Sequence, residues 1–211
     1  MSKTLLRREV NPRIYNAVDR ISAKLGIKDV VVYEFDSEEY TGLATSNGLL
    51  FPSALIRDAQ LYPHVFKFFV GHELIHFYHK EYGPKQAYIS AVAKFGTLFR
   101  IKGPMQKDNA NRLLIEMRAN IEGAVIAGLS NSEIINAQVL AQNKNDDDLI
   151  PVSYKVGYPD RNMISNFCTN YKKFDESVAR IISDDFCEKM HISEKEQFIN
   201  KIVEDFFISP L

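Results

Sequence analysis

Two histidines and a glutamate in the segment His72-Glu73-Leu74-Ile75-His76 have the types and the spacing of the metal-binding motif H-E-x-x-H. Side chains four residues apart lie on one face of a helix, so His72 and His76 can direct their rings at a single ion. Glu73 lies beside that ion, where it can take a proton from a water molecule. The motif is typical of zinc hydrolases, most often peptidases.

The residues around this motif predict a buried helix. Apolar side chains lead in from Val65 and continue past the motif, Pro63 suits a first helical turn, and Gly83-Pro84 predicts the end. A helix of about 18 residues that is apolar on nearly every side is expected to be buried. Two histidines and a carboxylate there would cost desolvation energy unless a metal ion paired with them. The alternative is a surface helix with incidental histidines.

A catalytic zinc ion usually has three protein ligands and one open position, so a third ligand is expected. The chain does not match the extended motif of metzincins, because His79 and Tyr82 occupy the positions where that motif has glycine and histidine. Peptide deformylases have a cysteine ligand upstream of the motif. This class is excluded as well, because Cys168 and Cys187 lie far downstream. His79 lies about 10 Å along the helix from His72. At that distance His79 cannot easily bind the same ion as His72 and His76. We therefore expect its side chain to support a ligand residue, to line the pocket or to lie on the surface.

A glutamate from a later helix is the expected third ligand. Residues 113–124 form a strongly helical run, with Asp108 or Asn109 as its predicted N-cap. Glu116 and Asn120 share one face of this helix, and the amide could supply the hydrogen bond that fixes a metal ligand.

Two alternatives to this assignment stay open. Glu122, on the same helix, is the reserve ligand. Glu116 could instead be a solvated carboxylate paired with Arg112 or Asn120. The upstream motif favours Glu116 as the ligand.

Both segments together, His72 to His76 and Glu116-Met117-Arg118-Ala119-Asn120, resemble the H-E-x-x-H and E-x-x-A-D/N motifs of gluzincin metallopeptidases. Two branches are similar, the M48 type and the ImmA/IrrE type (M78) of intracellular regulatory peptidases. Residues 40–56 resemble the M48 pattern of a substrate-binding edge strand, a turn and a second strand, whereas Asn120 resembles the M78 type. The resemblance covers roughly residues 28–128. It implies one zinc ion per chain, held by His72, His76 and Glu116, with Glu73 as general base and a peptide or protein as substrate.

The remaining patterns predict an α+β fold, in which a small N-terminal antiparallel or mixed sheet packs on the metal-binding helix and a mostly helical part follows. Residues 11–25 predict a helix, and residues 29–35 predict a strand. Ser46-Asn47-Gly48 predicts a hairpin between strands at 43–45 and 49–51. A substrate could pair with an edge strand at 41–45.

The second half of the chain is expected to be helical. Residues 86–100 predict a helix or an irregular insertion, Ser130 to Glu133 begin a helix that continues to Gln142, and residues 149–211 carry two or three helices. Asp146-Asp147-Asp148 is expected to be a solvated loop and not a cation site. We therefore expect a zincin-like core at 1–148 and a helical C-terminal extension at 149–211, packed on the core. Tyr158 and His191 are candidate oxyanion stabilisers, although either could be purely structural.

Composition narrows the functional classes. The chain has 211 residues, 45% of them hydrophobic, and a net charge of -1, which gives no support to direct nucleic-acid or membrane binding. Two cysteines do not make a disulfide framework. No apolar run is long enough for the core of a signal peptide or for a membrane span. We expect a soluble cytoplasmic protein. The alternative to a peptidase is a catalytically restrained regulatory or protein-binding module, against which the intact Glu73 argues.

Overall fold

The computed structural model describes residues 3–81, 103–145 and 157–208. Within these ranges four strands form one mixed sheet with the spatial order β1-β2-β4-β3. Strand β2 runs parallel to β4, while β1 on β2 and β3 on β4 are antiparallel. The central β4 is buried along its whole length, as expected for an apolar run covered on both faces. The strands are β1 (Lys3–Leu5), β2 (Val32–Phe35), β3 (Leu43–Thr45) and β4 (Gly48–Pro52).

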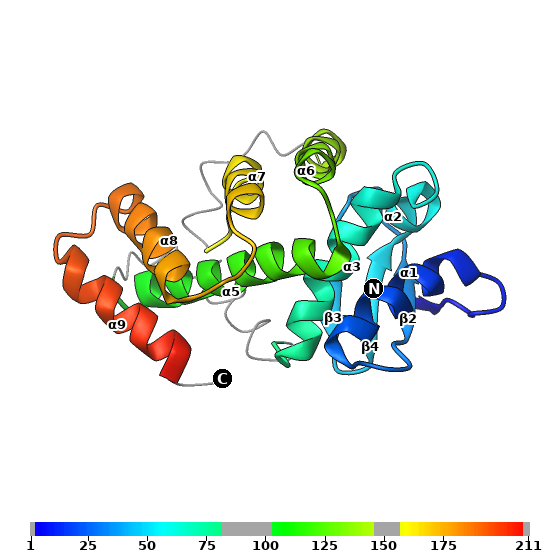
Figure 1. Cartoon of the computed structure of the whole chain (residues 1–211), viewed down its shortest axis with the longest axis horizontal. Helices are drawn as coiled ribbons and strands as arrows, with labels where there is room; N and C mark the ends of the chain where they lie inside the picture. Colours follow the sequence, from blue (N-terminus) through cyan, green and yellow to red (C-terminus); the bar gives the residue numbers. More distant parts are fainter. Residues whose placement is uncertain (1–2, 82–102, 146–156, 209–211) are drawn as a thin grey trace.

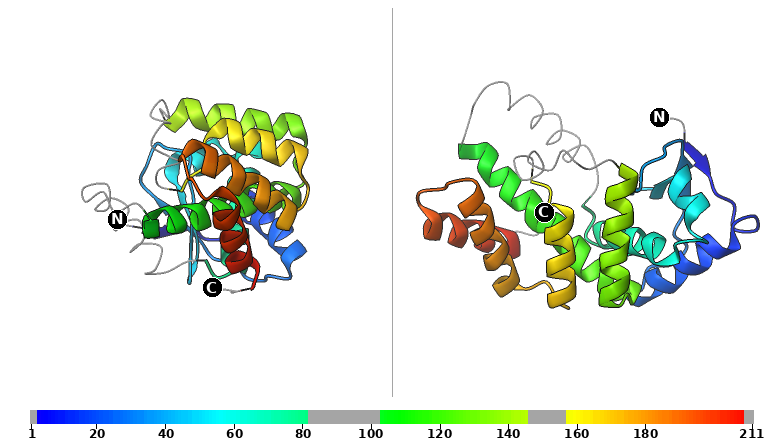
Figure 2. Two further views of the ribbon diagram at one scale, coloured as in Figure 1. Left: turned by 90° about the vertical axis from the view of Figure 1, so that its left-hand side faces the viewer. Right: turned by 90° about the horizontal axis from the view of Figure 1, so that it is seen from above.

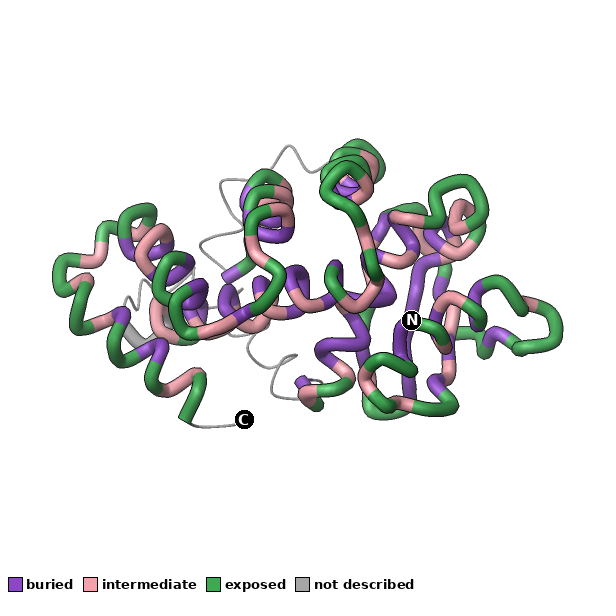
Figure 3. Tube along the Cα trace, viewed as in Figure 1, coloured by how far each residue is buried: buried purple, intermediate pink, exposed green. Residues whose placement is uncertain are grey.

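Three helices pack with this sheet at one end of the molecule (Figure 1). They are α1 (Pro12–Ser22), which continues into a 3-10 turn at Ala23–Leu25, α2 (Ser53–Asp58) and α3 (Pro63–Tyr78). Helix α3 contacts α1, α2, β3 and β4 on one side and α5 and α6 on the other. It is therefore buried on nearly every face, as its apolar sequence predicts (Figure 3).

The long helix α5 runs from the end of the molecule remote from the sheet towards it, and its C-terminal part lies against α3 (Figure 1). It crosses α3, and the later helices pack along it, with α8 and α9 at the end remote from the sheet (Figures 1 and 2). Helix α6 lies against both α3 and α7. The bounds are α5 (Gly103–Ala127), α6 (Asn131–Asn145), α7 (Arg161–Asn170), α8 (Glu176–Lys189) and α9 (Lys195–Ile208).

The α+β fold predicted from the sequence is confirmed, with a small mixed sheet followed by a mostly helical part. The predicted hairpin is present, with Ser46 and Asn47 as its turn and β3 at the sheet edge. Gly48 opens β4 at φ +135°, and a Cβ there would lie 2.2 Å from the carbonyl oxygen of Val31. Only glycine fits this close backbone contact.

Several predicted boundaries are wrong. Helix α3 ends at Tyr78, before Gly83-Pro84, because Lys80 turns the chain in the left-handed conformation. Helix α5 begins at Gly103, so Asp108 and Asn109 lie inside it and are not caps. Helix α6 continues to Asn145 instead of Gln142.

Some predictions fall on parts of the chain that are not described. The insertion at 86–100, the run at 146–148 and the proposed domain boundary at 148/149 lie outside the described residues. Residues 157–208 contain three helices, α7, α8 and α9, and each of them contacts α5. Cys168 and Cys187 are buried and free. Among the described helices, none combines the length and the hydropathy that crossing a membrane requires.

Helices α3 and α5 touch backbone to backbone at two glycines. A Cβ on Gly71 would lie 2.2 Å from the carbonyl oxygen of Gly123, and a Cβ on Gly123 would lie 2.6 Å from the backbone nitrogen of His72. No side chain larger than hydrogen fits between the helices at this point. The crossing therefore holds α5 close to the helix that carries the H-E-x-x-H motif.

Candidate metal centre

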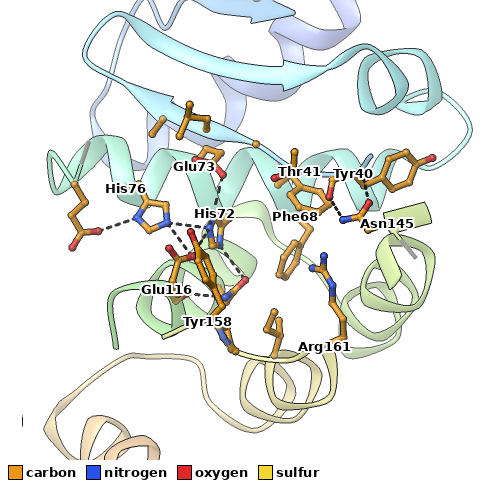
Figure 4. Close-up of a pocket in the computed structure, with 18 of the residues that line it drawn as sticks. Tyr40, Thr41, Phe68, His72, Glu73, His76, Glu116, Asn145, Tyr158 and Arg161 are labelled. Atoms are coloured by element: carbon orange, nitrogen blue, oxygen red, sulfur yellow. Dashed lines mark hydrogen bonds and ion pairs between the residues drawn. The ribbon is translucent and has the colours of Figure 1, made fainter. Parts of the chain in front are cut away.

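Three side chains from two helices converge where α3 and α5 cross (Figure 4). His72 and His76 lie on successive turns of α3, and Glu116 comes from α5. One nitrogen or oxygen atom from each lies within 4.8 Å of those of the other two, so the group could hold a metal ion. The structure thus brings together the three residues that the sequence predicts as ligands.

The separations within this group fit a small tetrahedral cation. The Nε2 atoms of His72 and His76 are 3.0 Å apart, and Oε2 of Glu116 lies 3.4 Å and 3.7 Å from them. Ligand atoms at about 2.0–2.1 Å from a tetrahedral zinc ion are about 3.3–3.4 Å from one another. The three measured distances bracket that value, so zinc or an ion of similar size fits the donor set.

Hydrogen bonds on the far side of each ring orient both imidazoles. Nδ1 of His72 lies 3.1 Å from Oδ1 of Asn120, whose Nδ2 donates to the backbone carbonyl of Glu116 at 2.8 Å. Nδ1 of His76 lies 3.1 Å from Oε2 of Glu81. Because both partners are acceptors, each Nδ1 carries a proton, and Nε2 of each ring is the nitrogen that faces the centre and would bind an ion. At 3.0 Å the lone pairs of two unprotonated Nε2 atoms would repel each other, so either a proton or a metal ion must lie between them.

The charges around the centre change the pKa values of two of these residues. Burial lowers the pKa of His76, but hydrogen bonds with Glu116 and Glu81 outweigh burial and raise that pKa to about 10. Without a metal ion His76 therefore carries a second proton at neutral pH, which an ion bound at Nε2 would displace. Burial raises the pKa of Glu116, yet hydrogen bonds with His72 and His76 outweigh it and hold the pKa below its usual range. The partly buried carboxylate of Glu116 is thus held as an anion beside two imidazoles, where it can neutralise a metal ion.

Glu73 lies beside this group without belonging to it. Its Oε1 is 3.9 Å from Nε2 of His72, and the residue is 4% exposed. Burial raises the pKa of Glu73, although nearby His72 and His76 and the backbone N–H of Ala44 act against burial. A Cβ on Gly42 would lie 2.7 Å from Cγ of Glu73, so glycine leaves room for this carboxylate.

A pocket of about 460 Å³ opens over the centre. One wall is the stretch that leads into β3, and the facing wall comes from α5 and from the start of α7 (Figure 4). The centre is therefore accessible to a molecule much larger than water. The wall residues include Tyr40, Thr41, Gly42, Leu43, Ala44, Phe68, Arg112, Asn145, Tyr158 and Arg161.

The structure separates the two candidate oxyanion stabilisers. Tyr158 lines the pocket, and its hydroxyl accepts a hydrogen bond from Arg112, whose guanidinium lies 4.1 Å from the centre of the tyrosine ring. Burial and the negative charge of Glu116 raise the pKa of Tyr158 to about 12, against the opposing effect of Arg112. His191 is exposed in the turn after α8 and does not line the pocket.

His79 and Glu122 pair with each other and not with the ligand group. His79 Nε2 lies 3.9 Å from Oε2 of Glu122, and both side chains are about one-third exposed. Neither is among the described residues that line the pocket. Glu122, the reserve third ligand, therefore lies away from the centre.

Sequence reasoning missed Glu81, Arg118 and Asn145. Arg118 donates to Glu81, the carboxylate that holds His76. Asn145 accepts from the backbone N–H of Tyr40 at 2.6 Å and donates to its carbonyl at 2.9 Å. The signal for Glu81 was its position five residues after His76, which becomes useful only when the chain is known to turn back at Lys80.

Comparison with known proteins found no relative: no family model, no curated protein and no solved structure matches the chain. The resemblance to gluzincins thus stays a prediction carried by two short motifs. The convergence of His72, His76 and Glu116 is independent of it, because it is a property of the folded chain.

Proposed function

We propose that this protein is a zinc-dependent metallopeptidase of the gluzincin type, with one zinc ion per chain held by His72, His76 and Glu116. The observation that carries the proposal is the meeting of these ligand atoms within 4.8 Å, beside a buried glutamate and beneath an open pocket. Purely structural zinc sites usually have four protein ligands, often cysteines. A site with three ligands leaves a position for chemistry.

When bound, zinc would supply Lewis acidity, which makes water a nucleophile near neutral pH and polarises a substrate carbonyl. Asn120 and Glu81 hold the two imidazoles in the orientation that this ion requires. Glu116 contributes the negative charge that partly neutralises the ion. The chain thus supplies a neutral donor pair and one anion.

Glu73 is the proposed general base and acid. The backbone N–H of Ala44 holds its carboxylate, and burial raises its pKa, which makes the carboxylate a stronger proton acceptor. It would take a proton from the attacking water and deliver it to the departing amine, so that the proton is conserved over the cycle. Its position 3.9 Å from Nε2 of His72 supports this role.

The β3 edge supports binding of an extended peptide. In an antiparallel ladder, the N–H and C=O of one residue point to the same side. Because the N–H of Ala44 faces Glu73, its carbonyl also faces the pocket, available to a substrate N–H. At Tyr40 both backbone groups are already bound by Asn145, so a substrate strand would pair between Gly42 and Ala44.

Tyr158 and Arg112 are suited to stabilise the negative charge that develops on the substrate oxygen. The raised pKa of Tyr158, about 12, keeps its hydroxyl protonated at neutral pH and able to donate. Arg112 donates to the same hydroxyl and adds positive charge at the pocket wall.

Metal analysis and peptide cleavage together test the proposal. Untagged wild type should contain about one zinc per chain, Glu116→Ala should lose it, and Glu73→Gln should keep it. Wild type should cleave a proteome-derived peptide mixture, read by mass spectrometry, and Glu73→Gln should not. Glu122→Gln is the matched control, because Glu122 is a helix α5 carboxylate outside the group. Zinc without cleavage in wild type would favour the regulatory or binding module; full activity in Glu73→Gln would refute the mechanism.

A further inference from the structure

The end of helix α3 returns the chain to one of the proposed metal ligands. Lys80 adopts φ +57°, a left-handed conformation that is uncommon for residues other than glycine. The N–H of Glu81 then donates to the carbonyl of His76 at 2.9 Å, and the N–H of Lys80 donates to Phe77 at 3.2 Å. These two bonds form a Schellman motif, which terminates the helix and turns Glu81 back over its last turns.

The Glu81 side chain bridges two helices inside the protein. Its side chain is 2% exposed, and its two oxygens have different partners: Oε2 faces Nδ1 of His76 at 3.1 Å, and Oε1 accepts from Arg118 of α5. Arg118 is two residues from Glu116 and lies 4.9 Å from the ring of Phe206 in α9. A carboxylate buried this deeply carries a large desolvation cost unless both oxygens are satisfied.

We propose that Glu81 is a positioning residue of the metal centre, which holds His76 in its metal-binding orientation and is itself held by Arg118. The inference rests on the metal site of the proposed function but not on peptidase activity. The Nδ1 of His76 needs an acceptor so that Nε2 is free for the ion, and Glu81 supplies it through the turn at Lys80. Arg118 ties that acceptor to the same helix that supplies Glu116, so the two helices share one electrostatic link beside the ligands.

A salt bridge that served stability alone would behave differently. Its loss would lower the stability of the metal-free protein and leave the intrinsic zinc affinity unchanged. Loss of a positioning carboxylate weakens metal binding itself, because the imidazole can rotate and its donor nitrogen becomes less basic. Zinc affinity, measured apart from stability, therefore separates the two roles.

The experiment compares Glu81→Ala and Glu81→Gln with Glu122→Gln as the matched control. The control removes the charge of another glutamate that pairs with a histidine across the same two helices, His79, which lies outside the ligand group. Zinc affinity is measured by competition with a chromogenic chelator, and the metal-free proteins are compared by urea unfolding. We expect Glu81→Ala to weaken zinc binding about 10- to 100-fold, Glu81→Gln less because its amide oxygen still accepts from Nδ1, and the control about twofold at most. The visible absorption of the cobalt-substituted protein should change in both Glu81 variants and not in the control.

Each outcome decides the proposal. If Glu81→Ala fails to fold, Glu81→Gln and its cobalt spectrum carry the test, since that variant keeps the size of the side chain. Wild-type zinc affinity and an unchanged cobalt spectrum in the folded Glu81 variants would overturn the positioning role, even if stability fell. A wild-type protein that binds no zinc would overturn this inference and the proposed function together. Zinc binding that depends on Glu81 without peptide cleavage would uphold the inference and refute only the peptidase proposal.

Discussion

Replacing Gly71 by alanine should separate the two helices that build the candidate metal centre. A Cβ at this position would lie 2.2 Å from the carbonyl oxygen of Gly123, whereas ordinary contacts begin at 3.4 Å. The backbones must therefore move apart by about 1.2 Å, because neither contact atom belongs to a flexible side chain. The same shift at Glu116 would stretch its distances of 3.4 Å and 3.7 Å to the two imidazoles to about 4.6–4.9 Å.

That displacement exceeds the reach of one ion. Two ligand atoms bound to the same zinc ion at 2.0–2.1 Å are at most about 4.2 Å apart. Glu116 would be withdrawn from the group, and we expect zinc affinity to fall more than about 100-fold. We also expect the variant to lose stability. Alanine usually stabilises a helix interior by about 1 kcal/mol relative to glycine, but here the overpacking should destabilise the fold by about 1–3 kcal/mol.

The assay is chelator competition for zinc, combined with urea unfolding of the metal-free protein. Ile182→Val in helix α8 is the control, because Ile182 is fully buried, its truncation should cost about 1 kcal/mol, and α8 is not one of the two helices that supply the ligand group. Gly123→Ala should reproduce the effect, since its Cβ would lie 2.6 Å from the backbone nitrogen of His72. A stabilised Gly71→Ala protein with wild-type zinc affinity would refute the reasoning about the crossing.

Three further predictions follow from the same geometry. Lys80→Gly should stabilise the protein by about 0.5–1 kcal/mol in urea unfolding, because glycine adopts the left-handed conformation of Lys80 without steric cost; a loss of stability would show that the lysine side chain contributes more than the strain. Tyr158→Phe should lower kcat about 100-fold or more and leave KM for the same peptide nearly unchanged, because only the hydroxyl donor is lost; an equal kcat would exclude Tyr158 from catalysis. Removing zinc with a chelator should lower Tm, since a ligand present at 100 times its Kd stabilises the folded state by about 2.7 kcal/mol, and Glu116→Ala should show no such shift.

Local patterns in the sequence were sufficient for the parts of the site that lie within one helix. The spacing of His72, Glu73 and His76 predicts a shared face, and the apolar residues around them predict burial, because both depend only on helical geometry. Glu116 and Asn120 were found for the same reason, since their four-residue spacing places them on one face of α5. To predict that these residues share a face, it was enough to predict that both segments are helices.

The parts that were missed depend on contacts between distant segments or on an unusual backbone conformation. Glu81 reaches His76 only because Lys80, a residue that does not favour it, adopts the left-handed conformation. From the sequence alone, Gly71 and Gly123 are glycines that weaken a helix. Their role in the close contact between α3 and α5 is evident only from the structure. The edge position of β3 was expected from the resemblance to M48 peptidases, but no local pattern indicates that β2 pairs in parallel with β4.

The hydrogen bonds between Asn145 and Tyr40 have a consequence for synthesis of the chain. Exposed strand edges can pair with other chains and so promote aggregation, and Asn145 covers one residue at the approach to β3. These partners are 105 residues apart in sequence. At the usual rate of about 5–20 residues per second, Tyr40 is made about 5–20 s before Asn145. For that interval a nascent chain bears an uncovered backbone edge beside its sheet, and this is the period in which a chaperone would protect it most.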